Sequence, residues 1–226
     1  SASNRRIVIL GKTGAGKSSL ANTIFGDEWF KISHTSKSET TKCKSDTKSI
    51  NGGSITLIDT PSFFDINKPE DELRGEIERC ISEFAPGPHA FLIVLKMGIH
   101  TKHQQDVINK IKQYFSEEVF NYSTVIFTHG DDLHEGVTIE DFVSVDQSLS
   151  DLVRKCGGRC HVIDNKYWKN KSKDKYRSNQ FQVEEILKSI DKMIKDNNDG
   201  YYTREMLPAK LPWRLWRRIQ KSITWL

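Results

Sequence analysis

The sequence predicts an α/β fold of three layers, in which a mainly parallel central sheet is covered by helices on both faces. Two observations support this fold class. Short apolar runs alternate with stretches whose apolar residues recur at helical spacing, and a glycine-rich motif follows the first apolar run directly. The 226 residues are enough for one such domain and a short extension.

Five apolar runs are predicted to be strands of the sheet. Strands of a parallel sheet are buried on both faces, so they are apolar throughout rather than at every second position. One further edge strand is predicted within the polar stretch Lys31–Asn51. The five runs are Ile7–Leu10, Ile55–Ile58, Ala90–Leu95, Thr124–Phe127 and Cys160–Ile163.

Four segments are predicted to be helices in addition to the one that follows the glycine-rich motif. Asp71–Ala85 and Gln104–Phe115 have the clearest helical periodicity, and Ile139–Arg154 and Gln182–Ile194 have weaker patterns. Asn197–Gly200 has the composition of a helix stop and linker. We therefore predict a domain over residues 5–196 and a C-terminal linker and helix over residues 197–226.

The positive charge of the chain is concentrated at its C-terminus. The net charge of the whole chain is +4. Five basic and no acidic residues follow Glu205, so the chain up to that residue contains 29 of the 34 basic residues and all 30 acidic residues. The last residues form a basic amphipathic pattern, with Leu211, Leu215 and Ile219 on its apolar side. This helix is predicted either to pack on the domain or to contact a membrane surface or a partner.

Several functional classes are disfavoured. A body so close to neutral lacks the basic surface on which nucleic-acid binding depends, so no nucleic-acid partner is expected. No apolar run reaches the length of a membrane-spanning helix, and the first residues have no apolar signal segment. The four cysteines form no zinc-binding pattern, so we expect reduced thiols and a cytoplasmic protein.

A complete phosphate-binding motif, G-x-x-x-x-G-K-[ST], lies between the first predicted strand and a helix. Its backbone N–H groups and the start of the helix would bind phosphate oxygens. Lys17 would neutralise the β- and γ-phosphates, and the Ser18 hydroxyl would ligate Mg²⁺. The predicted phosphate-binding residues are Gly11, Lys12, Thr13, Gly14, Ala15, Gly16, Lys17, Ser18 and Ser19.

Two further loops are predicted to complete a nucleotide site. Asp59 follows the run Ile55–Ile58 and would anchor Mg²⁺ through water, while Ser62 belongs to the loop that senses the γ-phosphate. Thr128–Leu133 has the pattern of a guanine reader, in which a carboxylate accepts two N–H donors that adenine lacks. His129 would cover the base. The reader is either Asp131 or Asp132, and the sequence leaves that choice open.

Together these motifs resemble the AIG1-type GTPases of the immunity-associated protein family (GIMAPs), relatives of the septin and Toc GTPases. The resemblance covers residues 5–194. It is most specific over Gly87–Gly98 and is also carried by Gly11–Gly26, Ser38–Thr40, Asp59–Asp65 and Thr128–Leu133.

The resemblance implies a G domain that binds GTP and GDP with Mg²⁺ and forms a homodimer or oligomer across its nucleotide face, in some members at intracellular membranes. On matching positions it implies Thr40 as the switch residue at the Mg²⁺ ion and Asn165 in the loop that closes over the base.

Ser62 stands where the family usually has Gly, and its N–H can still donate to the γ-phosphate if its backbone angles permit. Two other features predict slow hydrolysis: Phe63, like its counterparts in the family, supplies no Gln to orient water, and Ile99 replaces an Arg suited to act on the nucleotide of a partner. His100 or His103 could partly substitute for that Arg, so Lys17, Thr40 and His100 are the predicted catalytic residues. The two hypotheses are a slow GTPase and a GTP-loaded scaffold with essentially no hydrolysis.

Overall fold

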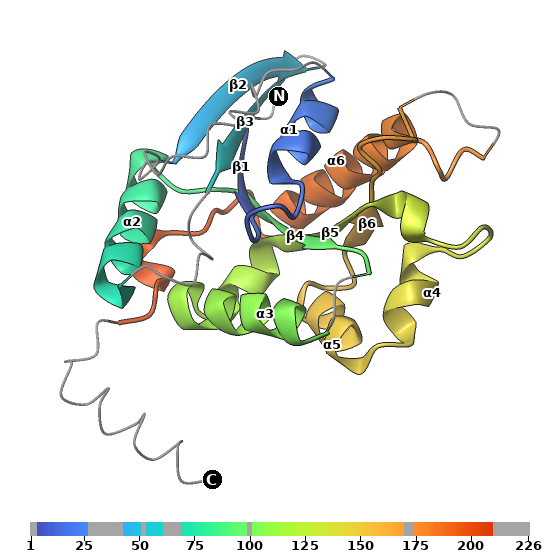
Figure 1. The fold of residues 1–226 in the computed structure, drawn as a ribbon. Helices are drawn as coiled ribbons and strands as arrows, with labels where there is room; N and C mark the ends of the chain where they lie inside the picture. The colour runs from blue at the N-terminus through green and yellow to red at the C-terminus, as the bar shows by residue number, and fades with distance from the viewer. Residues whose placement is uncertain are drawn as a thin grey trace, which may run out of the picture.

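The computed structural model describes residues 4–26, 43–50, 53–60, 69–98, 101–169 and 174–209, without the side chains of residues 101–103. These residues form a mixed sheet of six strands in the order β2-β3-β1-β4-β5-β6 (Figure 1). All neighbouring strands are parallel except β2 and β3. The strands are β1 (Asn4–Leu10), β2 (Lys44–Ile50), β3 (Gly53–Asp59), β4 (Ala90–Lys96), β5 (Ser123–Thr128) and β6 (Cys160–Val162).

Helices cover both faces of the sheet, as the alternating pattern predicts (Figure 1). One face packs against α1 and α6, and the other packs against α2, α3, α4 and α5. The helices are α1 (Lys17–Phe25), α2 (Glu70–Glu83), α3 (Thr101–Phe115), α4 (Ile139–Ser144), α5 (Gln147–Lys155) and α6 (Asn179–Asp196), with the 3₁₀ turns η1 (Glu117–Tyr122), η2 (Gly130–Asp132) and η3 (Arg204–Met206).

The predicted α/β fold is therefore confirmed, including all five apolar strands and the polar edge strand. β4 and β5 are buried along almost their whole length because helices lie on both of their faces. β2, at the edge, alternates between partly buried and exposed side chains. The carboxyl ends of the parallel strands lie at one edge of the sheet, and the predicted ligand-binding loops follow β1, β3, β5 and β6 there.

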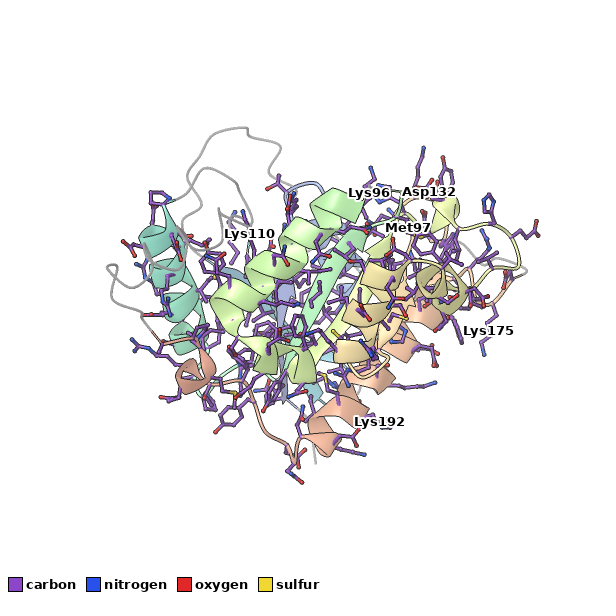
Figure 2. All side chains as sticks on the ribbon, turned by 90° about the horizontal axis from the view of Figure 1, so that it is seen from below. Lys96, Met97, Lys110, Asp132, Lys175 and Lys192 are labelled. Atoms are coloured by element: carbon purple, nitrogen blue, oxygen red, sulfur yellow. The ribbon has the colours of Figure 1, made fainter. Side chains whose placement is uncertain are left out.

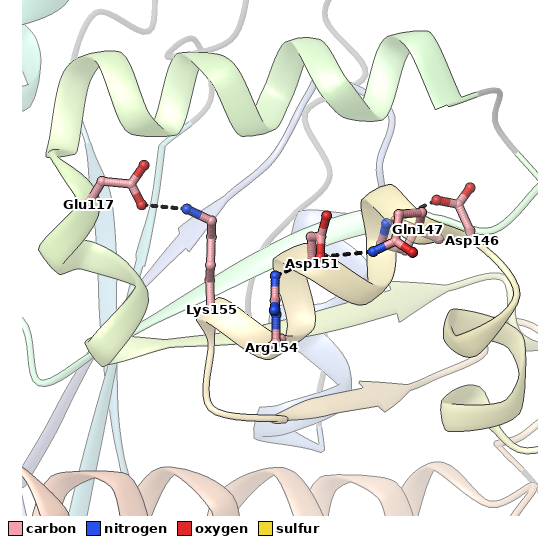
Figure 3. A network of polar contacts seen from close by, with 7 residues as sticks. Glu117, Asp146, Gln147, Asp151, Arg154 and Lys155 are labelled. Atoms are coloured by element: carbon pink, nitrogen blue, oxygen red, sulfur yellow. Dashed lines mark hydrogen bonds and ion pairs between the residues drawn. The ribbon is translucent and has the colours of Figure 1, made fainter.

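The prediction of one helix over Ile139–Arg154 was wrong, because the structure has two helices there. α4 ends at Ser144, and Asp146 is the N-cap of α5, where its side chain accepts a hydrogen bond from the Leu149 N–H at 3.0 Å. Figure 3 shows this cap and the ion pair of 2.8 Å between Lys155 of α5 and Glu117 of η1. The cap by Asp146 starts a second helix at a point where the spacing of the apolar residues alone predicts one continuous helix.

The segment at Gly87 lies at the sheet edge opposite the phosphate loop, because it precedes β4. There it contacts the chain that leaves α6. α6 ends at Asp196, as the Asn197–Gly200 sequence predicts, and Tyr202 is then fully buried with its N–H donating to the Pro88 carbonyl at 2.8 Å. A Cβ on Gly87 would lie 2.0 Å from the Tyr202 carbonyl oxygen. The Gly87 segment therefore packs against Tyr202, which lies within the stretch 197–226 that we predicted to be a linker and helix.

Candidate functional site

The phosphate loop connects β1 to α1 and requires glycine at particular positions. Gly14 and Gly16 have φ angles of +81° and +96°, which side chains rarely adopt. A Cβ on Gly11 would lie 2.8 Å from the Val94 carbonyl oxygen. Because its glycines allow these backbone angles and this close approach, the loop can turn its N–H groups toward a ligand at the start of α1.

Lys17 begins α1, and its ammonium group lies in the mouth of the phosphate loop. The Nζ donates to the carbonyl oxygens of Gly11 at 2.8 Å and Lys12 at 3.0 Å, and the side chain is 7% exposed. Two backbone carbonyl oxygens thus hold the buried ammonium at the phosphate loop. The arrangement suits a phosphate chain bound within the loop.

Asp59 ends β3 beside the phosphate loop and is 8% exposed. Its Oδ1 atom is buried without a hydrogen-bond partner. Burial raises the pKa of this carboxyl, while the charge of Lys17, a hydrogen bond from the Thr60 N–H and the charge of Lys44 counteract that rise. An orphaned, buried carboxylate oxygen is costly, and a hard cation or a water bound to one would satisfy it.

Thr128 joins the phosphate loop to the predicted base-reading loop. Its buried hydroxyl donates to the Ala15 carbonyl at 2.7 Å and lies 3.1 Å from the His129 Nδ1 atom. His129 itself has φ +61°, a left-handed conformation that is uncommon outside glycine. This strained residue begins the turn η2, which holds both candidate guanine readers.

A third loop follows β6 and brings Asn165 over the phosphate loop. A Cβ on Gly16 would lie 3.3 Å from the Asn165 Nδ2 atom, and Thr23 of α1 donates to Asn165 Oδ1 at 3.4 Å. The preceding Asp164 shapes this loop, because its carboxylate accepts hydrogen bonds from the Lys166 and Tyr167 N–H groups. The three predicted ligand-binding loops therefore meet at one place.

Asp131 and Asp132 face different neighbours. The Asp131 N–H donates to Asp164 Oδ2 at 3.3 Å, and the two side chains also hydrogen-bond, which places Asp131 on the side of the Asn165 loop. The Asp132 carboxylate lies 3.6 Å from where a Cβ on Gly98 would be, and Figure 2 shows Asp132 near Lys96 and Met97 at the end of β4. The two carboxylates thus lie on opposite sides of η2.

The carboxyl groups of Asp131 and Asp164 share a hydrogen bond and therefore titrate together. That hydrogen bond, followed by burial and the charge of Asp164, raises the pKa of Asp131. Burial alone would raise the pKa of Asp164, but hydrogen bonds from Asp131 and from the backbone of Tyr167 and Lys166 outweigh it and lower this pKa. As the pH falls, Asp131 is thus the member of the pair that takes up a proton first.

Some predicted site residues lie outside the described part of the chain. Thr40, Ser62 and His100 are among them, as are Phe63, Ile99 and the C-terminal segment 210–226. Among the described residues there is no helix that is both long and apolar enough to cross a membrane, and no cluster of three or more His, Cys, Asp or Glu side chains that could hold a metal. The Mg²⁺ site predicted from Ser18, Thr40 and Asp59 would contain one carboxylate, because Mg²⁺ commonly takes its other ligands from water and phosphate oxygens.

Sequence reasoning missed the residues that brace the base loops. Asn179, at the start of α6, accepts from the Asp164 N–H at 3.1 Å and donates to the Asp164 carbonyl at 2.6 Å. Trp168 packs on Gly130, where a Cβ would lie 2.7 Å from the ring. The one local signal was the Asp-Asn pair at 164 and 165, because Trp168 and Asn179 reach the site only through the fold.

Comparison with known proteins agrees with this arrangement. The AIG1 family model matches residues 5–212, which is most of the chain. The chain belongs to the AIG1 family. Its relatives include the immune-associated nucleotide-binding protein 10 of Arabidopsis thaliana, which is 33% identical over 207 residues, and the human GTPase IMAP family member 8, which is 28% identical over 200 residues.

These alignments cover 89% and 88% of the chain but only 43% and 29% of the two relatives. The chain spans about half the length of the first plant relatives of this AIG1 protein, whose covered shares are 43%, 58% and 56%.

Solved structures with the same fold include further G domains. Toc33 of Arabidopsis thaliana in complex with GDP and Mg²⁺ matches the AIG1 protein with a TM-score of 0.65 and 18% identity, over 85% of each chain. Era, bound to MgGDPNP and ribosomal RNA, matches with a TM-score of 0.54 and 17% identity, over 94% of this chain and 59% of Era. At these identities the likeness shows the P-loop G-domain fold.

Proposed function

We propose that this AIG1 chain is a guanine-nucleotide-binding module that takes GTP and GDP with Mg²⁺. The observation that carries the proposal is the hydrogen bond from Thr128 to the Ala15 carbonyl, which fixes the base-reading loop to the phosphate loop. A nucleotide has a base and a phosphate chain at a set separation, so a site built for it needs its two loops held together.

The buried Asp59 Oδ1 atom supports Mg²⁺ as the cation of this site. Ser18 follows Lys17 at the start of α1, and its hydroxyl together with Asp59 would hold the ion, with Asp59 acting through water. Bound Mg²⁺ neutralises charge on the β- and γ-phosphates. Within this chain, Lys17 would bind the phosphate chain and neutralise part of its negative charge.

Guanine recognition is assigned to Asp131 rather than to Asp132. Asp131 faces the loop of Asn165, which lies over the phosphate loop, whereas Asp132 faces Gly98 on the other side of η2. The carboxylate of Asp131 would accept the two N–H donors of guanine, and His129 would lie against the base.

We further propose that the nucleotide state controls dimerisation across the nucleotide face, with Thr40 and Ser62 as the residues that respond to the γ-phosphate. A pocket of about 200 Å³ between the phosphate loop, the end of β4 and α3 would leave room for a side chain of a second copy. It is lined by Lys12, Thr13, Gly14, Ala15, Val94, Leu95, Lys96, Gln104 and Val107. For the structurally similar Toc33 and Toc159 proteins, dimerisation is described as important for GTPase activity.

Hydrolysis is proposed to be slow, with Lys17, Thr40 and His100 in the catalytic roles. A GTP-loaded scaffold with essentially no hydrolysis is the second candidate, favoured by Ile99 at the position of the family arginine.

We place the protein in the cytoplasm, with no nucleic-acid partner. We also propose that the basic segment 210–226 contacts the surface of intracellular membranes, which cosedimentation with anionic lipid vesicles tests.

Calorimetry tests the binding proposal directly. GDP should bind at least about tenfold more tightly than ADP, because adenine lacks the two N–H donors that the Asp131 carboxylate would accept. Asp59→Asn should remove the Mg²⁺ dependence of GTP affinity, while Asp151→Asn, on the distant helix α5, should leave it unchanged. Equal affinities for GDP and ADP would contradict the proposal.

A further inference from the structure

The pocket between the phosphate loop, the end of β4 and α3 is separate from the proposed nucleotide site. Its volume is about 200 Å³, and residues 12–15 of the phosphate loop form one of its walls. Lys17 and Asp59, which belong to the proposed nucleotide site, do not line it. The two sites therefore share the phosphate loop as a common wall.

Gln104, in the first turn of α3, supplies an amide to this pocket. Its side chain is only 7% exposed and lines the pocket. The amide forms no hydrogen bond with any residue that the structure describes. A buried amide without a partner is costly, because burial removes it from water. A ligand that offers a hydrogen-bond acceptor to the amide N–H would satisfy it.

The other lining residues combine positive charge with apolar walls. Lys12 and Lys96 line the pocket, and among the described residues no acidic side chain does. Lys96 lies where β4 ends, beside α3 (Figure 2). Val94, Leu95 and Val107 make much of the remaining wall apolar. An anionic group is thus favoured near the two ammonium groups, and an apolar body against the aliphatic wall.

The volume of the pocket limits the size of its ligand. A cavity of about 150 Å³ holds a benzene ring, so one of about 200 Å³ has room for a single ring and one attached group. We propose that this pocket binds a small apolar carboxylic acid. The carboxylate accepts a hydrogen bond from the Gln104 amide and lies near Lys12 and Lys96, while the ring or branched chain packs on the apolar wall.

The effect of this acid on the nucleotide rests on the proposed function. Gly14 and Ala15 line the pocket, and the backbone N–H groups of the same loop would bind phosphate oxygens on its other side. An acid in the pocket would hold the loop in the observed conformation, in which the Lys12 carbonyl accepts from the Lys17 Nζ at 3.0 Å. We therefore expect the acid and GDP to strengthen each other's binding.

The first experiment uses benzoate as the probe. Amide chemical shifts of the full chain without nucleotide are followed while benzoate, benzamide or benzamidine is added. We expect saturable shifts at Gly14, Leu95 and the side-chain amide of Gln104, with a dissociation constant on the order of 1 mM for a ligand of this size. Neutral benzamide should bind at least about fivefold more weakly, and cationic benzamidine more weakly still.

Two substitutions of Gln104 separate the hydrogen bond from the charge. Gln104→Met keeps the length of the side chain but removes the amide, so benzoate should bind at least about fivefold more weakly. Gln104→Glu places a carboxylate in the pocket, so the preference should change from benzoate to benzamidine. Gln113→Met, in the last turn of the same helix and outside the pocket, is the matched control and should bind benzoate like the parent chain.

Three results would overturn the inference. They are the absence of saturable shifts at the pocket residues, equal binding of benzoate and benzamidine by the parent chain, and a Gln104→Met variant that binds benzoate as the parent does.

The second experiment measures GDP affinity by calorimetry with and without saturating benzoate. We expect GDP to bind at least about fivefold more tightly with benzoate, the low end of typical coupling between two sites, and a smaller gain in Gln104→Met at the same benzoate concentration. Unchanged GDP affinity would overturn the coupling, while the mapped benzoate site would still stand. Failure of GDP to bind under either condition would instead count against the proposed function.

Discussion

Asp131 and Asp132 are adjacent and chemically identical, but their side chains face different neighbours. Both lie in η2, but Asp131 shares a hydrogen bond with Asp164 while Asp132 faces Gly98. The backbone of a 3₁₀ turn directs successive side chains roughly 120° apart, so only one of them can face the base loop. The proposed assignment of guanine recognition to Asp131 rests on that direction and not on residue type.

Asp131→Ala should weaken GDP binding by roughly tenfold to a hundredfold, which corresponds to one or two lost hydrogen bonds to a charged acceptor. ADP binding should not change, because adenine offers no matching donor pair. Calorimetry with both nucleotides measures this, and Asp132→Ala is the matched control. A larger loss in Asp132→Ala than in Asp131→Ala would show that the assignment is wrong.

GDP affinity should also depend on pH through Asp131. Its pKa is raised by the hydrogen bond with Asp164, and guanine requires the ionised carboxylate as acceptor. Affinity should therefore be constant at neutral pH and fall, by up to about tenfold per pH unit, as the pH drops below that raised pKa. Asp131→Asn should bind weakly and show no such fall. Calorimetry across mildly acidic buffers measures the profile, and a flat profile in the parent chain would contradict it.

At the scale of elements, the two edges of the sheet have separate tasks. The carboxyl ends of the strands carry the nucleotide loops, whereas the start of β4 carries the Gly87 segment and receives the chain after α6. Tyr202 packs there edge-on to Phe91 and Tyr122, and its hydroxyl donates to the Phe115 carbonyl. The Gly87 segment thus packs against the chain after α6, away from the edge that carries the nucleotide loops.

Gly87→Ala tests the role of that close approach. Its Cβ would overlap the Tyr202 carbonyl oxygen, so we expect the free energy of unfolding to fall by about 1–3 kcal/mol, as for other overpacked sites. Gly75→Ala in α2 is the control, because a Cβ there meets nothing within 4 Å and alanine favours a helix by up to about 1 kcal/mol. Urea denaturation measures both. Equal effects of the two substitutions would refute the docking role.

At the scale of the whole molecule, the nucleotide face and the segments beside it should act together in assembly. Sedimentation should show more dimer with a non-hydrolysable GTP analogue than with GDP, because only the γ-phosphate would favour the ordered arrangement of Thr40 and Ser62. Identical sedimentation of the two forms over a wide concentration range would contradict control by the nucleotide.

Turnover measured against protein concentration separates the slow GTPase from the scaffold. We expect well below one GTP per second even when dimeric, because neither Phe63 nor Ile99 supplies the charge or the water contact that phosphoryl transfer needs. A rate per molecule that rises with concentration supports a dimer-activated enzyme, and a flat baseline supports the scaffold. Turnover of several GTP per second would show that another residue does this chemistry.

The sequence by itself determined the sheet, the phosphate loop and the family of this protein. Each depends on local information: apolar runs whose strands are buried on both faces, and a motif whose glycines and lysine are close together in the chain. For the same reason the edge strand β2 and the end of α6 could be predicted. The break between α4 and α5 could not be predicted from periodicity, because Asp146 ends the pattern through a hydrogen bond.

Only the tertiary structure decided how Asp131 and Asp132 are oriented, how Asn179 and Trp168 brace the base loops, and that Tyr202 docks under Gly87. Each of these facts joins residues that are far apart in the chain. Contacts between residues far apart in the chain leave no periodic or compositional signal, because the local sequence around each residue does not reveal which distant residue it will contact. They exist once the sheet has brought its loops to a common edge.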